Sequence, residues 1–317
     1  MTQTIFDNWK PEHSQLWGQI PILQQHNLNK SPLFTDDALA DLIENYPRKD
    51  YSLVVPGRQD KKHHHQWREG DIGNATGAEV LKAIKNGFLW INLRNMPLNS
   101  PLFKELAEQL FDEMKTNVPG LKINDYDMTL LVTSPGAQTY YHCDVPGQSL
   151  WHIRGRKKAY LYPATAPFMP DELLERVIMQ ETEEEIPFEQ WFDDQATVVD
   201  LEPGMMAHWP QFSPHRVENY DSLNVSITTE YWTNEIERNY KVRYANGLLR
   251  RKFHMNPKST DTNGMAYLSK AILQSVWRRS GLAKKHVWSR KIDFKLDPSN
   301  LDEMIDITPF HISPGNG

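Results

Sequence analysis

Short apolar runs of strand length dominate the middle of the chain. Between Tyr126 and Trp232 they are separated by turn signals such as Pro135-Gly136 and Pro203-Gly204, a pattern typical of an all-β sandwich or a jelly roll. The predicted strands are Met128 to Thr133, Trp151 to Ile153, Lys157 to Tyr162, Thr197 to Leu201, Met205 to His208, His215 to Glu218 and Val225 to Trp232.

The regions on either side have helical periodicity instead. Phe34 to Asn45 has an N-cap candidate at Thr35 and acids in its first turn, so it predicts a helix. The predicted elements divide the chain into an N-terminal mixed region (1–120), a β-rich core (121–235) with an acidic insertion near 170–195, and a helical C-terminal region (236–317). The other predicted flanking elements are helices over Ala78 to Asn86 and Pro101 to Lys115, and a strand over Gly87 to Leu93.

The composition is that of a globular protein. Of the 317 residues, 39% are hydrophobic and 24% charged, which excludes the disordered class. No run approaches the roughly 20 apolar residues of a membrane span. The single cysteine, Cys143, excludes an internal disulfide and fits a reducing compartment, so we expect a cytoplasmic protein without a membrane span.

The charge is distributed unevenly along the chain. From Lys241 to Lys295 there are 14 Lys and Arg but only two acids, so this segment carries +12 while the remainder carries −18. Such a segment could meet an acidic partner, an anionic lipid or nucleic acid. Alternatively, it packs against the acidic body of the same chain, for example beside Glu181 to Glu185.

A histidine and an aspartate stand one residue apart in the sequence TYYHCDVPG. On a strand, positions i and i+2 share one face, so His142 and Asp144 would present an imidazole and a carboxylate side by side. Two histidines and one carboxylate on one face of a metal form the arrangement used by non-haem Fe(II) oxygenases. The candidates for the third ligand are His152, His208, His215 and His254.

Two ordered series of residues carry a family resemblance over roughly residues 128–232. The first follows Thr-x-x-His-x-Asp with an apolar strand, Gly-x-Lys and an aromatic strand ending in Pro, and the second runs from a Pro-Gly turn to a strand ending in Trp. The chain thereby resembles the JmjC-type branch of the cupin Fe(II)/2-oxoglutarate oxygenases, most closely the asparaginyl-hydroxylase group typified by factor inhibiting HIF. The matching positions are Thr139, His142, Asp144, Gly155, Lys157, Pro163, Pro203-Gly204, Pro210, His215 and Tyr231-Trp232.

This resemblance implies a mainly β fold, a double-stranded β-helix with helical flanks. It implies Fe(II) held by His142, Asp144 and His215, with 2-oxoglutarate and O2 as co-substrates. The far carboxylate of 2-oxoglutarate would meet Lys157, assisted by Thr139, and Gln148 matches a family position occupied by an amide. Strand alternation also places Lys157 inward and Lys158 outward.

The resemblance implies hydroxylation of a C–H bond, with succinate and CO2 as co-products, in a protein, peptide or small-molecule substrate. Ser213-Pro214 and Met205 depart from the family pattern and would reshape the pocket wall. Glu230 and Trp232 could contact substrate at the mouth, and His208 could line the pocket. Two alternatives stay open: a cupin-fold regulatory protein that binds metal and 2-oxoglutarate without turnover, and an N-demethylase using the same chemistry.

The segment Thr262 to Leu282 predicts an amphipathic helix. Met265, Leu268, Ile272, Val276 and Trp277 recur at near-helical spacing. We expect this apolar stripe to be buried, either on the barrel or on a second copy of the chain. Because members of the family commonly dimerise through helices that follow the barrel, the resemblance favours a homodimer.

Overall fold

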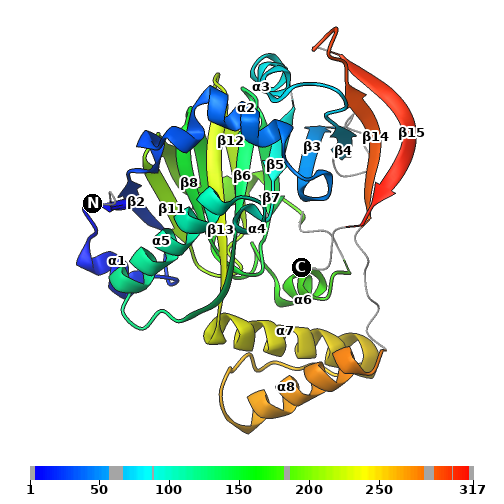
Figure 1. The fold of residues 1–317 in the computed structure, drawn as a ribbon. Helices are drawn as coiled ribbons and strands as arrows, with labels where there is room; N and C mark the ends of the chain where they lie inside the picture. Colours follow the sequence, from blue (N-terminus) through cyan, green and yellow to red (C-terminus); the bar gives the residue numbers. More distant parts are fainter. Residues whose placement is uncertain are drawn as a thin grey trace.

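The strands divide between two sheets that face each other (Figure 1). The computed structural model describes residues 4–56, 67–87, 89–181, 186–281, 289–301 and 303–313. The large sheet has the order β1-β2-β11-β8-β13-β6-β5-β3-β4-β14-β15, and the small sheet has the order β10-β9-β12-β7. Between them lies an apolar layer that includes Leu150 and Ala207 from the large sheet and Leu161 and Leu201 from the small one.

Strands β6 to β13 form the whole of the small sheet and the central part of the large one. The large sheet takes β6, β8, β11 and β13, the small sheet takes β7, β9, β10 and β12, and all their pairings are antiparallel. All seven strands predicted from the sequence are present, together with an eighth, β7. The bounds are β6 Ile123–Thr133, β7 Gln138–His142, β8 Gly147–Arg154, β9 Lys157–Leu161, β10 Thr197–Leu201, β11 Met205–Trp209, β12 His215–Asn219 and β13 Asn224–Thr233.

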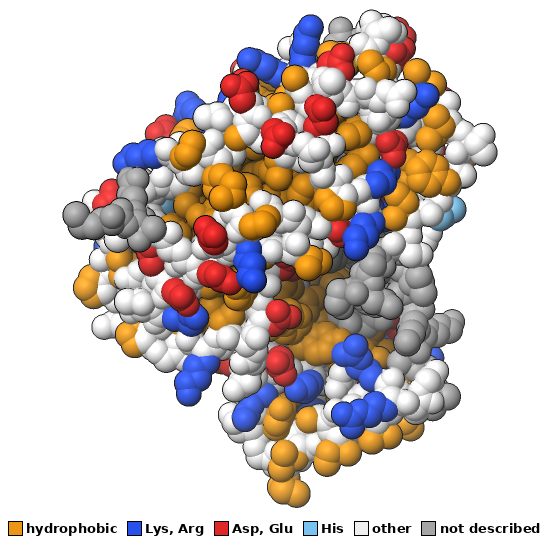
Figure 2. Space-filling model, in the orientation of Figure 1, with side chains coloured by type: hydrophobic (Ala, Val, Ile, Leu, Met, Phe, Trp, Pro, Cys, Tyr) orange, Lys and Arg blue, Asp and Glu red, His pale blue; other side chains and the backbone are white. Residues whose placement is uncertain are grey.

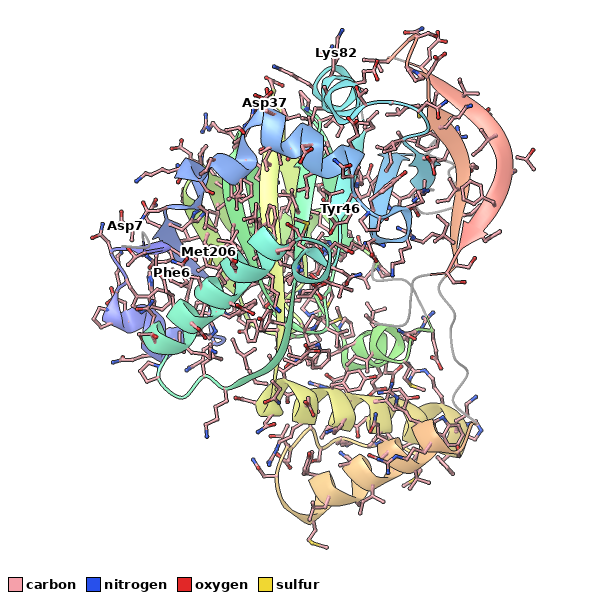
Figure 3. The ribbon with its side chains drawn as sticks, viewed as in Figure 1. Phe6, Asp7, Asp37, Tyr46, Lys82 and Met206 are labelled. Carbon is pink, nitrogen blue, oxygen red and sulfur yellow. The ribbon has the colours of Figure 1, made fainter. Side chains whose placement is uncertain are left out.

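The N-terminal region extends the large sheet and covers its outer face. Helices α2, α3 and α5 place their buried residues against this face, in the same core cluster as Leu130 and Trp151. Phe6 and Met206 point into this cluster, whereas Asp37 and Lys82 point to solvent (Figure 3). The elements are β1 Phe6–Asp7, α1 Pro11–Leu16, β2 Ile22–His26, α2 Asp36–Glu44, β3 Tyr51–Pro56, β4 Trp67–Asp71, α3 Gly77–Asn86, β5 Trp90–Leu93, α4 Met96–Asn99 and α5 Pro101–Asn117, with 3₁₀ turns at Leu28–Lys30, Pro32–Phe34 and Arg48–Asp50.

The predicted helices begin where the sequence places their caps. The Thr35 side chain accepts a hydrogen bond from the Ala38 backbone N–H at the start of α2, as predicted. Thr76 and Glu79 form a reciprocal capping box at the start of α3. None of the described helices combines the length and the apolar character that a transmembrane helix requires.

The C-terminal region is not helical throughout, and this part of the prediction is wrong. After α7 (Asn234–Phe253) and α8 (Gly264–Arg279), the chain forms β14 (Arg290–Leu296) and β15 (Met304–Ile312). Strand β14 joins β4 in parallel and buries Ile292, Phe294 and Leu296 on one face. The period-two alternation of these three residues is a strand signal, and the partner β4 that completes the pairing lies more than 200 residues earlier in the chain.

Three arginines of the basic C-terminal segment are paired with the acidic insertion. The insertion carries α6 (Asp171–Ile178) and a 3₁₀ turn at Gln190–Gln195, and α6 packs against α7. Glu175 is fully buried and lies 3.1 Å from Arg250 Nε, while Arg251 Nε lies 2.6 Å from Glu181. A further ion pair joins Arg243 to Asp171 at 2.6 Å. Helix α7 therefore packs against the acidic body of its own chain, and of the glutamate run considered above only Glu181 lies within the described residues.

Candidate metal centre and co-substrate pocket

Three side chains converge at one end of the small sheet. The His215 Nε2 atom lies 3.2 Å from Asp144 Oδ2, and the His142 Nε2 atom lies 3.8 Å from the same oxygen. Within the described chain, His142, Asp144 and His215 are the only group of three such side chains that could hold a metal ion. The structure thus brings together the three ligands that the resemblance implied.

Strand pairing explains this convergence. His142 at the end of β7 is directly opposite His215 at the start of β12, and the centres of their rings lie 4.1 Å apart. Asp144 lies two residues beyond the end of β7. The strand argument therefore identified the shared face correctly, although the aspartate itself lies in the turn that leads to β8.

Backbone carbonyls orient both imidazoles. The Nδ1 atom of His142 lies 2.7 Å from the Tyr140 carbonyl oxygen, and the Nδ1 atom of His215 lies 3.2 Å from the Ser213 carbonyl oxygen. A carbonyl can only accept, so each Nδ1 carries the proton, and each Nε2 presents its lone pair toward Asp144. This is the tautomer that metal-binding histidines adopt when their second nitrogen donates to the backbone.

Asp144 is held in its ionised form. Burial by itself raises the pKa of this carboxyl, but the hydrogen bond and positive charge that His215 and His142 provide when protonated outweigh it, so the net pKa is lowered. The Asp144 Oδ2 atom is buried and accepts no hydrogen bond from the residues that the structure describes. A buried anionic oxygen without a donor, facing two imidazole lone pairs, requires a cation. The three residues therefore fit a divalent metal held by two histidines and one carboxylate.

A narrow pocket extends from the triad into the space between the sheets. Its volume open to the centres of water molecules is about 80 Å³, several times what one water requires. His142 and His215 lie on its wall, together with Lys157. The other lining residues are Trp90, Leu131, Thr133, Ala137, Gln138, Thr139, Gln148, Leu150, Trp209, Val217, Asn219 and Thr228.

Lys157 is a buried cation without a counterion. Its side chain is only 3% exposed, and within the described residues no ion pair or hydrogen bond joins its ammonium to another side chain. Burial lowers the pKa of Lys157 to about 7 because the charged form loses its hydration. Lys158 faces the other way, with its Nζ 5.8 Å from the centre of the Tyr220 ring, as the strand alternation predicts.

The two other residues expected to bind the co-substrate both line this pocket. Gln148 is buried, contacts the Asp144 carboxylate, and leaves its own Oε1 without a partner. Thr139 lines the pocket but remains exposed to solvent. Both side chains are therefore available to a polar ligand in this space.

The residues proposed for substrate contact lie in different places. Glu230 on β13 is directly opposite Gln148 on β8, and Trp232 lies half-buried near the end of the same strand. His208 does not line the pocket, which corrects the expectation. It lies on the opposite face of β11 from Trp209 and stacks on Trp17 at 3.8 Å, because alternate residues of a strand face opposite sides.

The two other candidates for the third ligand, His152 and His254, are also excluded by their positions. His152 is buried with its Nδ1 3.0 Å from Ser226 Oγ, and burial together with the charge of Lys157 lowers its pKa to about 3. His254 is exposed at the end of α7. Neither belongs to the cluster around Asp144.

Some pocket residues were not found from the sequence. Trp209 packs against the His215 ring with a centre-to-centre distance of 4.4 Å. Asn219 follows His215 and Val217 on the inward face of β12, so alternation along that strand could have identified it. Trp90 comes from the distant strand β5, and no local signal indicates its position.

The comparisons with known proteins support the fold. No family model matches the sequence, and no curated protein sequence matches it. Two solved structures of YcfD from Escherichia coli are similar to the chain. One matches with a TM-score of 0.51 and 15% identity over 90% of this chain and 70% of that protein. The other is described as a ribosomal oxygenase in complex with cobalt and 2-oxoglutarate, and it matches with a TM-score of 0.50 and 16% identity over 88% and 69% of the two chains. At these identities the likeness shows a shared fold.

Proposed function

We propose that this protein is an Fe(II)- and 2-oxoglutarate-dependent oxygenase with the double-stranded β-helix (jelly roll) of the JmjC type. The observation that carries the proposal is that His142 and His215 of the triad line the same pocket as Lys157. The triad offers two imidazoles and a carboxylate to a metal. Lys157 adds a buried ammonium that has no ion pair within the described residues. A dicarboxylate that chelates the metal through one end and meets Lys157 with the other would satisfy both.

The chain's own residues would divide the work. When bound by His142, Asp144 and His215, Fe(II) supplies the open positions at which 2-oxoglutarate and O2 react. Lys157 would neutralise the far carboxylate, and the Thr139 hydroxyl would donate a hydrogen bond to it. Gln148 would hold Asp144 in place, while Trp209 would keep the His215 ring oriented. The substrate would be oxidised at a C–H bond, and the YcfD complex with cobalt and 2-oxoglutarate supports the same ligand pair for this fold.

Turnover separates this proposal from a binding protein without activity. With Fe(II), ascorbate and O2, we expect the purified protein to convert 2-oxoglutarate slowly to succinate even without substrate. Succinate and residual 2-oxoglutarate would be followed by mass spectrometry, with an anaerobic sample as the control. Tight 2-oxoglutarate binding without any succinate would instead support the regulatory alternative.

We also propose a homodimer formed through α8. Of the predicted stripe, Trp277 packs against the core of the chain, but the other four residues are exposed, with Met265 81% and Ile272 64% exposed. Apolar side chains line the lower edge of the molecule in Figure 2. Helix α8 instead buries Lys270 and Gln274. A continuous apolar stripe left open on a single chain favours association with a matching surface, and the same stripe on a second copy offers one.

Charged substitutions in the stripe test the dimer. We expect Leu268→Asp with Ile272→Asp to give a monomer by sedimentation at micromolar concentration, because each would place an unpaired charge in the interface. Leu102→Asp changes a leucine that is exposed on α5 and should leave the dimer intact. A wild-type protein that sediments as a monomer, or a double variant that stays dimeric, would contradict the proposal.

A further inference from the structure

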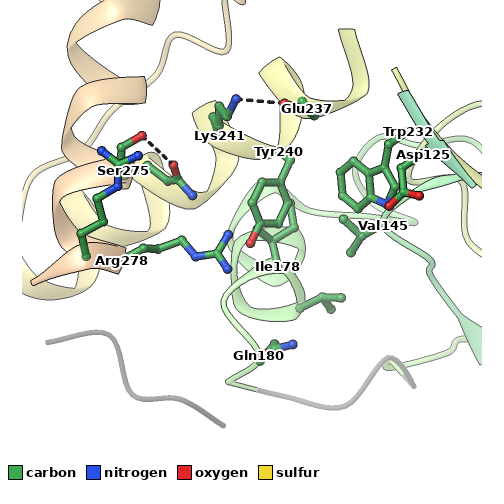
Figure 4. A pocket seen from close by; sticks show the side chains of 13 residues that line it. Asp125, Val145, Ile178, Gln180, Trp232, Glu237, Tyr240, Lys241, Ser275 and Arg278 are labelled. Atoms are coloured by element: carbon green, nitrogen blue, oxygen red, sulfur yellow. Dashed lines mark hydrogen bonds and ion pairs between the residues drawn. The ribbon is translucent and has the colours of Figure 1, made fainter. Parts of the chain in front are cut away.

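A larger cavity lies at the mouth of the barrel, outside the co-substrate pocket. Its volume is about 750 Å³ by the same measure. Val145, which follows the ligand Asp144 directly in the chain, and Trp232, at the end of β13, lie on the barrel side (Figure 4). Most of the other lining residues, including Ile178 and Tyr240, come from helices α6, α7 and α8. A molecule in this cleft would therefore contact Val145, the residue that follows Asp144 in the chain.

Some charged side chains of the cleft form ion pairs, and others do not. Glu237 is paired with Lys241 at 3.0 Å, as Figure 4 shows. Arg278 and Arg279 line the cleft in the last turn of α8 and are exposed, and neither has an ion pair within the described residues. The cleft thus has unpaired positive charge on the side of α8.

A helix dipole alone does not account for both arginines. Cations in the last turn of a helix are stabilised by only about 0.3–1 kcal/mol, and this would not require them to line a cavity. The Arg278 guanidinium also lies close enough to the Tyr240 hydroxyl to lower its pKa, although burial raises that pKa more. Arg278 therefore reaches toward the aromatic floor of the cleft, where it would meet a ligand.

The surroundings favour an acidic peptide over nucleic acid. Arg243, Arg250 and Arg251 are already paired with the acidic insertion, so these three cations of the C-terminal segment are not available to a phosphate backbone. Asp125 lies on the barrel side of the same cleft and would repel a chain of phosphates running through it, whereas a single carboxylate can be held away from it at α8. The amide side chains of Gln180 and Gln274 line the cleft and can bond peptide groups.

We propose that this cleft binds a peptide segment of the substrate that carries an acidic side chain, which Arg278 and Arg279 hold at α8. The residue to be oxidised would then lie beside Val145 and Trp232, next to the triad. This inference rests on the proposed oxygenase function and adds to it the substrate class and a specificity determinant.

The test uses the full-length protein loaded anaerobically with cobalt and 2-oxoglutarate. Fluorescein-labelled degenerate decapeptides would be compared by anisotropy in three sets that differ only in carrying two Glu, two Gln or two Lys at randomised positions. We expect the Glu set to bind roughly tenfold more tightly than the Gln set, since charge-assisted hydrogen bonds stabilise by about 1.5–3 kcal/mol. In the Arg278→Glu, Arg279→Glu variant this preference should disappear and the Lys set should bind best.

Three controls make the outcome decisive. Lys252→Glu with Lys258→Glu makes the same change of charge at exposed residues outside the cleft and should keep the preference for the Glu set. Arg278→Lys with Arg279→Lys should retain most of it. The absence of a Glu preference in wild type, its survival in the charge-reversed variant, or tighter binding of a 12-nucleotide single-stranded RNA would overturn the proposal. Succinate formation without peptide, measured separately in each variant, reports on the oxygenase function itself, so its failure is distinguishable.

Discussion

Replacing His215 with alanine is expected to reduce metal affinity by more than about 100-fold and to abolish succinate formation. Removing a residue that only orients a metal ligand costs about 10–100-fold, so removing a ligand itself should cost more. In this protein the loss would leave Asp144 facing a single imidazole, because the described residues offer no other histidine within reach of that carboxylate. Titration with Co(II), followed by visible absorption, measures the affinity directly.

The matched control is a histidine outside the site. His254 is exposed and adopts a left-handed conformation at the end of α7, which asparagine tolerates. His254→Asn should therefore bind Co(II) like wild type. Both variants should keep the thermal unfolding transition of the wild type, and an undiminished Co(II) affinity in His215→Ala would refute the ligand assignment.

Replacing Lys157 with alanine is expected to weaken 2-oxoglutarate binding at least tenfold while leaving metal affinity unchanged. The far carboxylate would then be buried without a partner, at a cost of about 1–3 kcal/mol or more for a charged group. Isothermal titration of 2-oxoglutarate into the anaerobic Co(II) protein gives the 2-oxoglutarate affinity, and titration with Co(II), followed by visible absorption, gives the metal affinity. Lys158→Ala, which removes the neighbouring outward-facing amine, should change neither.

The pH dependence distinguishes an anchoring ammonium from a residue that only fills space. Burial lowers the pKa of Lys157 to about 7, so above this pH the free protein must take up a proton before the ammonium can meet the carboxylate. The 2-oxoglutarate affinity of wild type should therefore fall as the pH rises from 7 to 9, while that of Lys157→Ala should stay level. A level wild-type profile would mean that Lys157 does not bind the anion in its charged form.

The lowered pKa of Lys157 also affects the stability of the fold, and this effect changes with pH in the opposite direction to the affinity for 2-oxoglutarate. Between about pH 7 and the ordinary lysine pKa, the unfolded chain keeps the Lys157 proton that the folded, ligand-free chain has lost. The unfolded state then binds more protons, so Lys157 makes the free energy of unfolding rise with pH in this window. Ligand binding and folding therefore place opposing demands on one side chain, as is common for buried groups at functional sites.

Local patterns in the sequence predicted most of the central fold. Alternating apolar residues and Pro-Gly turns located the seven strands from Met128 to Trp232, because a strand half-buried between two sheets must alternate. The strand β7 was recognised only through His142 and Asp144, since Gln138 to His142 is polar and aromatic and carries little apolar alternation.

Other elements depended on distant segments. Strand β14 pairs with β4, and the polar face of α8, with Lys270 and Gln274, packs toward α7 while its apolar stripe stays open. Periodicity shows that a helix has two faces but not which one the rest of the chain will cover. Of the two expected places of burial, the barrel of the same chain leaves Met265, Ile272 and Val276 exposed, and burial on a second copy stays a prediction.

The sequence by itself determined the chemistry available to this protein: the spacing of His142 and Asp144, the inward position of Lys157, and the uneven distribution of charge. The first two follow from positions a few residues apart, which strand geometry alone relates to one another. The charge distribution follows from the composition of whole segments. The family resemblance implied His215 as the third ligand, but only the tertiary structure brought it opposite His142 and turned His208 away from the triad. The tertiary structure alone paired the basic α7 with the acidic insertion and left Arg278 and Arg279 in a cleft that Val145 also lines, because contacts between distant segments depend on how the whole chain packs.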